Sequence, residues 1–231
     1  MKIKATAVLI ILIASLGCKK SDSAKDEVNF PHDNLQNSPG TWMVDFSDYP
    51  AGQETFYELG SSNSKLPSPL DSTVMGLKVT GNNHSDDLFM FIKKRVTGLK
   101  PNHEYKVKIE VELASNAAKN GIGIGGAPGE SVYLKAGLVP IEPLKTLEAG
   151  QPNYVLNLDK GNQAAAGEDL HNIGNIANGL DVYQYVIIKR SAEFAGKTDD
   201  KGEGWFIIGT DSGFEGPTSL YYTNVMVNLA E

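Results

Sequence analysis

The strongest constraint on the fold is a strict alternation of charged and apolar side chains in residues 106–113, KVKIEVEL. The apolar positions are Val107, Ile109, Val111 and Leu113, and every position between them is Lys or Glu. A helix would scatter these apolar residues around its circumference, whereas a strand places them all on one face. The segment therefore predicts a β-strand with one buried face and one solvent face.

Other segments have the length and composition of strands and are separated by Gly, Pro, Asn or Asp residues. Residues 88–92, LFMFI, are apolar on both faces, which predicts a central strand. The stretch before residue 106 reads as a turn, with Gly98 and the pair Pro101-Asn102 at its corners. The further strand candidates are residues 42–46, 55–59, 73–79, 130–137, 153–158, 181–190, 203–210 and 219–229. About ten such segments predict an all-β domain, a β-sandwich or jelly roll. Residues 162–172 alone have a helix-like composition, and Gly167 argues against a helix there.

The N-terminus has the layout of an export signal. Lys2 and Lys4 precede an apolar run over residues 5–16, which is too short to span a bilayer, since a span needs about 20 residues. Cys18, the one cysteine of the 231 residues, follows directly. A single thiol forms no intrachain disulfide, so its position after the apolar run favours a modified cysteine.

The residues Ser15-Leu16-Gly17-Cys18 resemble the lipobox of bacterial lipoproteins, although the leucine stands one place nearer the cysteine than usual. The resemblance implies cleavage before Cys18, a diacylglycerol on its sulfur and a third acyl chain on its amine. A lysine directly after the cysteine, here Lys19, resembles the arrangement in lipoproteins that are passed on to the outer membrane, where they face the periplasm or the outside. An ordinary secretory signal that happens to contain a cysteine is the alternative.

Polar residues after the cysteine predict a flexible tether over residues 18–40, followed by one folded domain over residues 41–231. Cleavage after residue 17 would leave 19 basic and 28 acidic residues. This acidic balance argues against nucleic acid as a partner, because nucleic acid is bound through Lys and Arg. The partners expected are therefore the membrane, through the lipid anchor, and an extracellular glycan or surface protein.

Residues 95–113 and 219–229 resemble two strands and a turn of bacterial galactose-binding-like jelly rolls, which include many carbohydrate-binding modules. The resemblance implies a jelly-roll sandwich and leaves the function open. Thr223 stands where that family often has an aspartate that binds a structural calcium ion, which departs from the pattern.

Two short motifs suggest chemistry that their surroundings do not support. Gly121, Gly123 and Gly126 match a dinucleotide fingerprint, but no helix signal follows them, so close packing on another backbone is the better interpretation. Ser212 lies in GTDSGFEGP, which looks like a serine-protease motif. None of the histidines, at positions 32, 84, 103 and 171, has the context of a catalytic base, so this stretch predicts an inter-strand loop.

Metal and ligand sites are weakly marked. No zinc motif is present, and no cofactor is expected apart from a possible structural calcium ion, for which two acidic loops offer oxygen atoms. The calcium candidates are Asp86, Asp87, Asp199, Asp200 and Glu203. The long stretch 158–179 predicts a binding loop, because loops of this length are usually functional or disordered. The ligand-binding candidates are Asp159, Asn162, Gln163, His171, Asn172, Asn175 and, on the presumed outer face of the last strand, Tyr222.

Three hypotheses for function remain open at this level. The first is a non-catalytic sandwich that binds a glycan or another extracellular ligand. The second is an enzyme acting on polysaccharide, for which Glu112, Glu130 and Asp159 are possible carboxylates whose separation decides the mechanism. The third is a structural or adhesin-like subunit that binds other proteins. The sequence favours the first and contains no catalytic residue that can be named.

Overall fold

The computed structural model describes residues 27–30, 33–36, 40–85 and 87–231, and in it the alternating segment forms β8 (Glu104–Ser115). Its four apolar side chains are buried and the charged side chains between them are exposed or half-buried. The prediction of a strand with one wet face is confirmed, because successive side chains of a strand point to opposite sides.

The strands form three antiparallel sheets. The first sheet has the order β13-β8-β15-β6-β5, and two short N-terminal strands also pair with β15; its strands are β13 (Val186–Lys197), β8, β15 (Pro217–Ala230), β6 (Met75–Asn82), β5 (Gly60–Lys65), β1 (Glu27–Asn29) and β2 (Asp33–Asn34). The second sheet has the order β12 (His171–Asn175), β9 (Val132–Val139), β14 (Gly204–Ser212), β7 (Leu88–Val96) and β3 (Met43–Ser47). The third consists of β10 (Lys145–Leu147), β11 (Asn153–Leu156) and β4 (Tyr49–Pro50).

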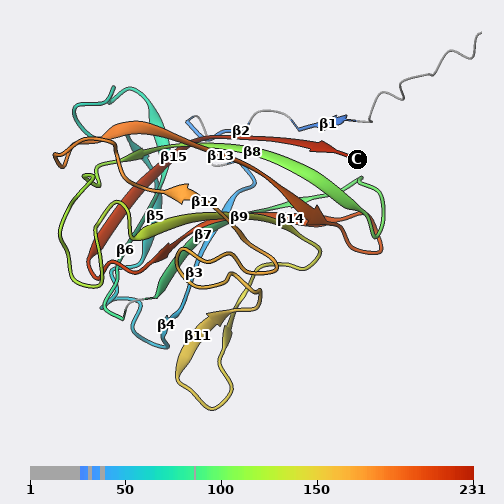
Figure 1. Ribbon diagram of the computed structural model, residues 1–231, viewed down its shortest axis with the longest axis horizontal. Coiled ribbons are helices and arrows are strands. Elements are labelled where there is room, and N and C mark those ends of the chain that lie inside the picture. Colours follow the sequence, from blue (N-terminus) through green and yellow to red (C-terminus); the bar gives the residue numbers. More distant parts are fainter. Residues whose placement is uncertain (1–26, 31–32, 37–39, 86) are drawn as a thin grey trace, which may run out of the picture.

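The seven-stranded and five-stranded sheets pack face to face, and the three-stranded sheet projects from the lower side of the molecule in Figure 1. No helix occurs in the described residues. The predicted fold class, an all-β sandwich, is confirmed. No helix of the described chain is long and apolar enough to cross a membrane.

Strand β7 lies between β14 and the edge strand β3, and its residues 88–92 are buried on both faces, as the sequence predicts; the central position of the sheet belongs to β14. Leu88, Met90 and Ile92 belong to the main core between the sheets. Phe89 and Phe91 point the other way and pack in a second core with side chains from outside the two large sheets. Those covering side chains are Leu156, Leu158 and Leu170. The segment after β9 therefore covers the outer face of the five-stranded sheet, and this cover shapes the site described below.

The last strand corrects one sequence-based expectation. Tyr222, predicted on the outer face, is 1% exposed and lies in the main core. The pairing of β15 with β8 shifts register between Tyr222 and Asn224, which is a β-bulge. A bulge adds one residue and so reverses which face the following side chains occupy. Tyr222 and Val225 thus both face the core, and Tyr222 offers no surface to a ligand.

Two further segments differ from expectation. Residues 55–59, predicted as a strand, form turns, whereas residues 162–170 contain no helix, in agreement with the argument from Gly167, and His171 begins β12. The strand expected at residue 181 begins only at Val186, and Tyr183, which precedes it, is 64% exposed. The two strands β5 and β12 lack an apolar pattern and are not marked in the sequence.

Part of the predicted tether is ordered against the sandwich. Leu35 is buried in the main core, and the ring of Phe30 lies edge-on to that of Phe206 with 5.5 Å between centroids. Strands β1 and β2 pair with β15. The folded domain therefore includes residues before position 41, because apolar side chains in this stretch complete the core. The lipobox at Ser15-Leu16-Gly17-Cys18 lies outside the described residues.

Candidate functional site

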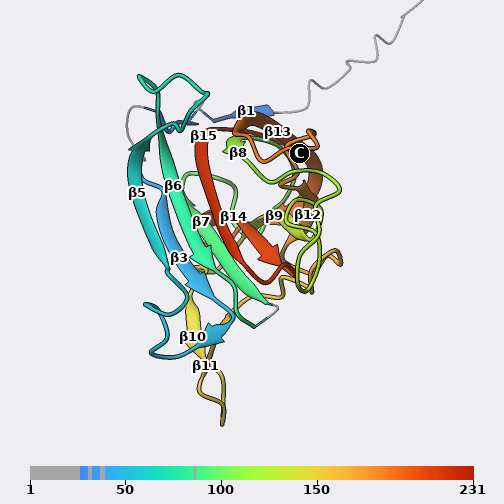
Figure 2. The same cartoon turned by 90° about the vertical axis from the view of Figure 1, so that its left-hand side faces the viewer.

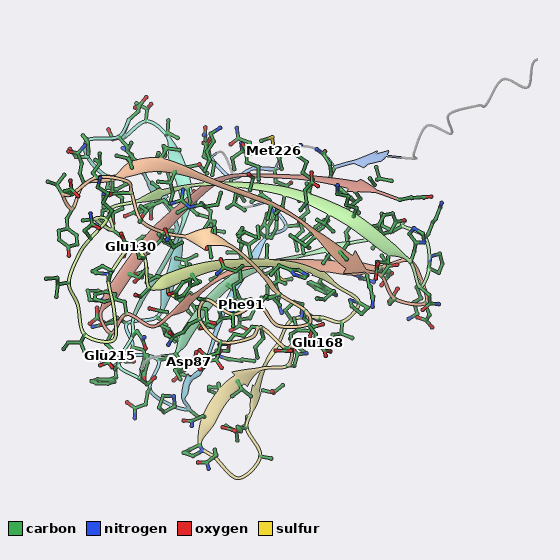
Figure 3. The ribbon with its side chains drawn as sticks, viewed as in Figure 1. Asp87, Phe91, Glu130, Glu168, Glu215 and Met226 are labelled. Carbon is green, nitrogen blue, oxygen red and sulfur yellow. The ribbon has the colours of Figure 1, made fainter. Side chains whose placement is uncertain are left out.

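A cavity of about 380 Å³ opens between the three-stranded sheet and the loop that connects β6 to β7. Figure 2 shows β10 and β11 extending below the sandwich beside this loop, and Figure 3 places Asp87 on the same lower side. The lining residues are Asp48, Tyr49, Pro50, Ser85, Asp87, Glu148, Asn153, Tyr154 and Val155. Carboxylates, an amide and tyrosine rings therefore meet in one concave site.

Asp48 enters the cavity because the backbone turns sharply between β3 and β4. Its φ angle is 63°, a left-handed conformation that aspartate tolerates better than most residues. The Asp48 N–H donates to the carbonyl oxygen of Tyr154 at 2.8 Å, and the Ser47 hydroxyl donates to the Asp48 carboxylate at 2.8 Å. These bonds hold a less common backbone conformation at the edge of a cavity, a combination often found at functional sites.

Two lysines and three aspartates form a charged cluster beneath the cavity. Lys160 Nζ lies 3.0 Å from Asp87, 3.1 Å from Asp211 and 3.9 Å from Asp48. Lys135 Nζ lies 2.9 Å from Asp211 and also donates to the carbonyl oxygen of Lys160. The side chains of Lys135 and Asp211 are fully buried. Buried charges persist only when they are paired and hydrogen-bonded, as they are here.

The cluster changes the acidity of the cavity carboxylates. Burial raises the pKa of Asp48 to about 7; the charge of Lys160 opposes this rise, and that of Asp87 adds to it. Burial likewise raises the pKa of Asp87, again against the effect of Lys160. Asp48 therefore keeps its proton to a higher pH than an ordinary aspartate, and in the protonated form it can donate a hydrogen bond as well as accept one.

Tyrosine rings form one wall of the cavity. The rings of Tyr49 and Tyr154 lie 5.4 Å apart between centroids. Lys145 Nζ sits 4.9 Å from the centre of the Tyr154 ring and donates to the Tyr49 hydroxyl at 2.9 Å. Tyr49 is buried and its hydroxyl also bonds Glu54, whereas Tyr154 is half-buried and remains reachable from the cavity. The wall is thus fixed before any ligand arrives.

Several polar groups of the lining have no partner within the described part of the chain. The Ser85 hydroxyl, the Glu148 carboxylate and the Asn153 side-chain amide make no hydrogen bond or ion pair there. A cavity with an aromatic wall and a few convergent polar groups is the usual form of a small-molecule site. The available groups suit a ligand rich in hydroxyls, because they both donate and accept.

The predicted binding loop has a different role at its first positions. The Asp159 carboxylate accepts the N–H groups of Gly161 and Glu168, and these bonds lower its pKa. Asn162 is exposed in a turn, and the N–H of Gln163 donates to the buried Asp211 carboxylate at 2.8 Å. The loop folds back on itself and onto the charged cluster, and none of these side chains lines the cavity.

The remaining candidates of that loop lie along β12. Asn172 and Asn175 accept backbone N–H groups two residues ahead, from Gly174 and Ala177, which is the usual turn role of asparagine. His171 stacks on Phe194 with 4.9 Å between centroids and borders a separate hollow of about 220 Å³. The structure therefore does not bring the predicted binding residues into one site. Asp159, Asn162, Gln163, His171, Asn172 and Asn175 remain untested as ligand contacts.

The calcium candidates also lie apart. Asp87 pairs with Lys160, Glu203 pairs with Arg95, and Asp199 accepts the N–H groups of Lys201 and Glu203. Asp200 is exposed, and Asp86 lies outside the described residues. In the described ranges, no three His, Cys, Asp or Glu side chains gather in a way that could hold a metal ion. Calcium stays a prediction from sequence.

The two short motifs are structural. Gly123 packs so closely that an added Cβ would lie 2.4 Å from the Phe214 ring, and at Gly125 it would lie 2.1 Å from the carbonyl oxygen of Gly213. Close packing on protein is thus confirmed, although the segment is a loop rather than a strand. Ser212 is the last residue of β14 and its hydroxyl donates to the carbonyl of Phe214, so the inter-strand loop is confined to residues 213–216 and residues 209–212 belong to the strand.

The carboxylates considered for hydrolysis are engaged at different places. Glu112 pairs with Lys189 on the outer face of the seven-stranded sheet at 2.9 Å. Glu130 accepts the N–H of Asn120 in the glycine-rich loop, and Asp159 closes the turn described above. Among the described residues, the carboxyl groups whose pKa is raised are instead those of Asp48 and Asp87.

Sequence reasoning missed most of the site. Asp87 was considered only as a calcium ligand, and Asp48, Lys135, Lys160 and Asp211 were not singled out. One signal was available: Lys135 and Asp211 each interrupt an apolar strand, VYLKAG and FIIGTDS. A charged residue within a doubly buried strand requires a partner.

Comparisons with known proteins add little to this description. No protein-family model matches the chain, and no curated protein matches it. Among solved structures, the enzymatically active domain of bacteriophage CBA120 tailspike protein 4 is 12% identical with a TM-score of 0.33, over 85% of this chain and 20% of that chain. A structure of carbohydrate-binding modules from the β-sandwich super family is 10% identical with a TM-score of 0.40, over 84% and 60%.

An adhesin domain of Lys-gingipain from Porphyromonas gingivalis w83 is 8% identical with a TM-score of 0.39, over 87% of this chain and 98% of that chain. The present chain spans less than two thirds of the first two of these solved chains. At such TM-scores the likenesses carry no argument about a ligand or an activity.

Proposed function

We propose that this protein is a lipid-anchored, non-catalytic binding protein whose sandwich takes a glycan in the cavity beside the three-stranded sheet. The observation that carries the proposal is the cavity lining. The cavity is lined by the half-buried Tyr154 and by Asn153 and Ser85, whose side-chain amide and hydroxyl have no partner in the described chain. A sugar ring has apolar C–H faces and a polar rim, so it matches a wall of this composition.

The rigidity of the wall supports binding of a flexible ligand. Tyr154 is held by β11, by the Tyr49 ring and by the ammonium of Lys145 above it. A site that is already ordered loses less conformational entropy when a ligand binds. Asp48 and Asp87 add two carboxyl groups that form strong hydrogen bonds to hydroxyls.

The binding experiment uses a glycan array followed by titration calorimetry with the best ligand. We expect Asn153→Ala to weaken binding about tenfold, the effect of one lost hydrogen bond. Asn116→Ala is the matched control, because Asn116 is also half-buried and lines another cavity of about 270 Å³. An array with no binding at millimolar glycan would refute the proposal, as would equal weakening by both variants.

The anchor is supported by the sequence around Cys18. Three acyl chains would hold the protein firmly, whereas one chain binds a membrane only weakly. Mass spectrometry of the mature N-terminal peptide should find an acylated cysteine, and Cys18→Ala should move the protein from the membrane fraction to the soluble fraction. An unmodified cysteine in the membrane-extracted protein would contradict the anchor and leave glycan binding intact.

One observation favours hydrolysis as a second candidate function. Asp48, whose pKa is raised to about 7, shares the cavity with a second carboxyl group, Asp87. Glycosidases use one protonated carboxyl group to donate a proton to the glycosidic oxygen and a second carboxylate as nucleophile or base. If this applies, Asp48→Asn should abolish release of reducing ends from the ligand found on the array while binding persists. Ligand that stays intact with the wild-type protein would exclude it.

A further inference from the structure

An exposed aromatic pair stands next to the cavity. Phe56, in the loop between β4 and β5, is 57% exposed. Its ring stacks on that of His84, with 4.1 Å between centroids and 24° between planes. The Nε2 atom of His84 lies 3.1 Å from the carbonyl oxygen of Phe56. The two rings are thus fixed against each other at the surface.

The pair is connected to the cavity wall through buried rings. Tyr57 contacts Phe56, His84 and Tyr49, with centroid distances of 5.8, 5.3 and 5.8 Å. Tyr49 in turn contacts Tyr154. A continuous series of aromatic contacts therefore runs from the cavity to the surface.

The two loops that carry the pair are also held together by the backbone. The N–H of Asn82 donates to the carbonyl oxygen of Tyr57 at 2.6 Å, and its side chain donates to Glu58 at 3.0 Å. His84 and the cavity residues Ser85 and Asp87 belong to the same short loop. The position of Phe56 beside the cavity is therefore set by the fold.

A single exposed phenylalanine needs no explanation in general. This one differs because a second exposed ring supports it from behind, which orders a side chain that would otherwise rotate freely. Protein docking is the less suitable alternative. No other large hydrophobic side chain of the described residues in 51–59 or 82–87 is strongly exposed, whereas a stable protein interface needs about 800 Å² on each partner.

We propose that Phe56 and His84 form a second subsite, which stacks on one face of a sugar ring when the neighbouring ring of the same chain occupies the cavity. The proposal rests on the proposed function and narrows its ligand class to oligosaccharides with at least two pyranose units. The apolar C–H face of a pyranose lies on the Phe56 ring, and the His84 edge is available to an adjacent hydroxyl. The two subsites together bind an oligosaccharide more tightly than either binds a monosaccharide.

The test compares a monosaccharide with an oligosaccharide of the same sugar by titration calorimetry, using the sugar found on the array. Phe56→Ala should weaken oligosaccharide binding about tenfold, the size of one aromatic contact, and leave monosaccharide binding unchanged. Phe56→Tyr should restore the affinity because it keeps the flat ring. Tyr183→Ala is the control, since Tyr183 is 64% exposed and lines the other cavity.

The outcomes separate the two proposals. Oligosaccharide affinity that Phe56→Ala leaves unchanged overturns the subsite, and the cavity proposal stands if Asn153→Ala still weakens binding. Equal losses for both sugars in Phe56→Ala also overturn it, because they indicate a collapsed loop. Wild-type protein that binds no glycan overturns the cavity proposal and the subsite together.

Discussion

Lysines and acidic residues form ion pairs on both outer faces of the sandwich, but these pairs are exposed on one face and buried on the other. On the seven-stranded sheet, lysines and glutamates stand in solvent and pair across strands, as in Lys189–Glu112 and Lys106–Glu193. On the five-stranded sheet, the segment after β9 covers Phe89 and Phe91, and the Lys135–Asp211 pair is sealed beneath it. The outer face of the seven-stranded sheet, called the wet face below, is exposed to solvent, whereas the outer face of the five-stranded sheet is buried in a second core.

The difference shows where function is to be sought. An exposed pair contributes little because solvent screens it, whereas a buried pair restricts both the structure and the acidity of nearby groups. The large upward pKa shift of an aspartate, at Asp48, occurs on the covered side. The same cover contributes to the cavity, because Asn153, Tyr154 and Val155 of its strand β11 line it together with Ser85 and Asp87.

The largest expected effect comes from Lys135→Met, which removes the buried ammonium and keeps the side-chain volume. Asp211, which is fully buried, then loses one of its two lysine partners. Breaking a buried pair in this way costs about 3–5 kcal/mol of unfolding free energy. Urea denaturation measures the change. If Lys135→Met lowers the unfolding free energy as little as Lys189→Met on the wet face, the proposed difference between the two faces is wrong.

The apolar part of the cover should show the next largest effect. Leu170 is fully buried against the outer face of the five-stranded sheet, and Leu170→Ala should lower the unfolding free energy by about 3 kcal/mol. Leu147, in the same covering segment, is 60% exposed, and Leu147→Ala should change the urea midpoint very little. Equal, small effects at both positions would show that the segment does not form a second core.

The contrast between the faces explains how much the sequence could predict. The wet face follows from local alternation, since the side chains of β8 from Glu104 to Leu113 point in turn to solvent and to the core. The double burial of β7 also follows, because Leu88 to Ile92 are apolar on both faces. What covers the outer face cannot be read locally: Leu156, Leu158 and Leu170 lie far along the chain in a segment without a regular period.

The candidate site was less predictable than the fold for the same reason. Asp48, Asp87 and Asn153 come from three separate stretches and meet only after the small sheet folds against the loop. Tyr222 was misplaced because the bulge after it is invisible in the alternation. The predicted turn at Gly98 and Asn102, by contrast, is confirmed, since both residues adopt the positive φ angles that glycine and asparagine tolerate.

A moderate effect is expected from pH at Asp48. Its pKa is about 7 in the folded protein and about 3.8 when unperturbed, so the folded state binds the proton more tightly. The stability from this group is complete below pH 4 and is lost as the pH rises through 7. Asp48→Asn removes this loss and fits the same backbone conformation. Between pH 4 and pH 8 the variant should therefore gain stability relative to the wild-type protein, by about 1.4 kcal/mol for each unit by which burial raises the pKa of Asp48.

The measurement is the urea midpoint of both proteins at pH 4, 6 and 8. Asp87 has a raised pKa of the same origin, so some pH dependence remains in the variant and only the difference between the proteins is diagnostic. If the urea midpoints of the wild-type protein and of Asp48→Asn change with pH in the same way, the Asp48 carboxyl group is not buried as described.

The smallest effect should appear on the wet face and depend on salt. Glu193 pairs with Lys106, and the side chains of both are about half exposed or more. Salt at 0.1 M screens charges beyond about 10 Å, and exposed pairs are weak even at low salt. Glu193→Gln should leave the urea midpoint unchanged at 0.15 M salt and lower it slightly at 0.01 M. For Lys135→Met the loss should be nearly the same at both salt concentrations, because bulk ions do not reach a sealed pair. If added salt reduces the lowering of the urea midpoint in Lys135→Met as strongly as in Glu193→Gln, water and ions enter beneath the cover. The distinction between the two outer faces would then no longer hold.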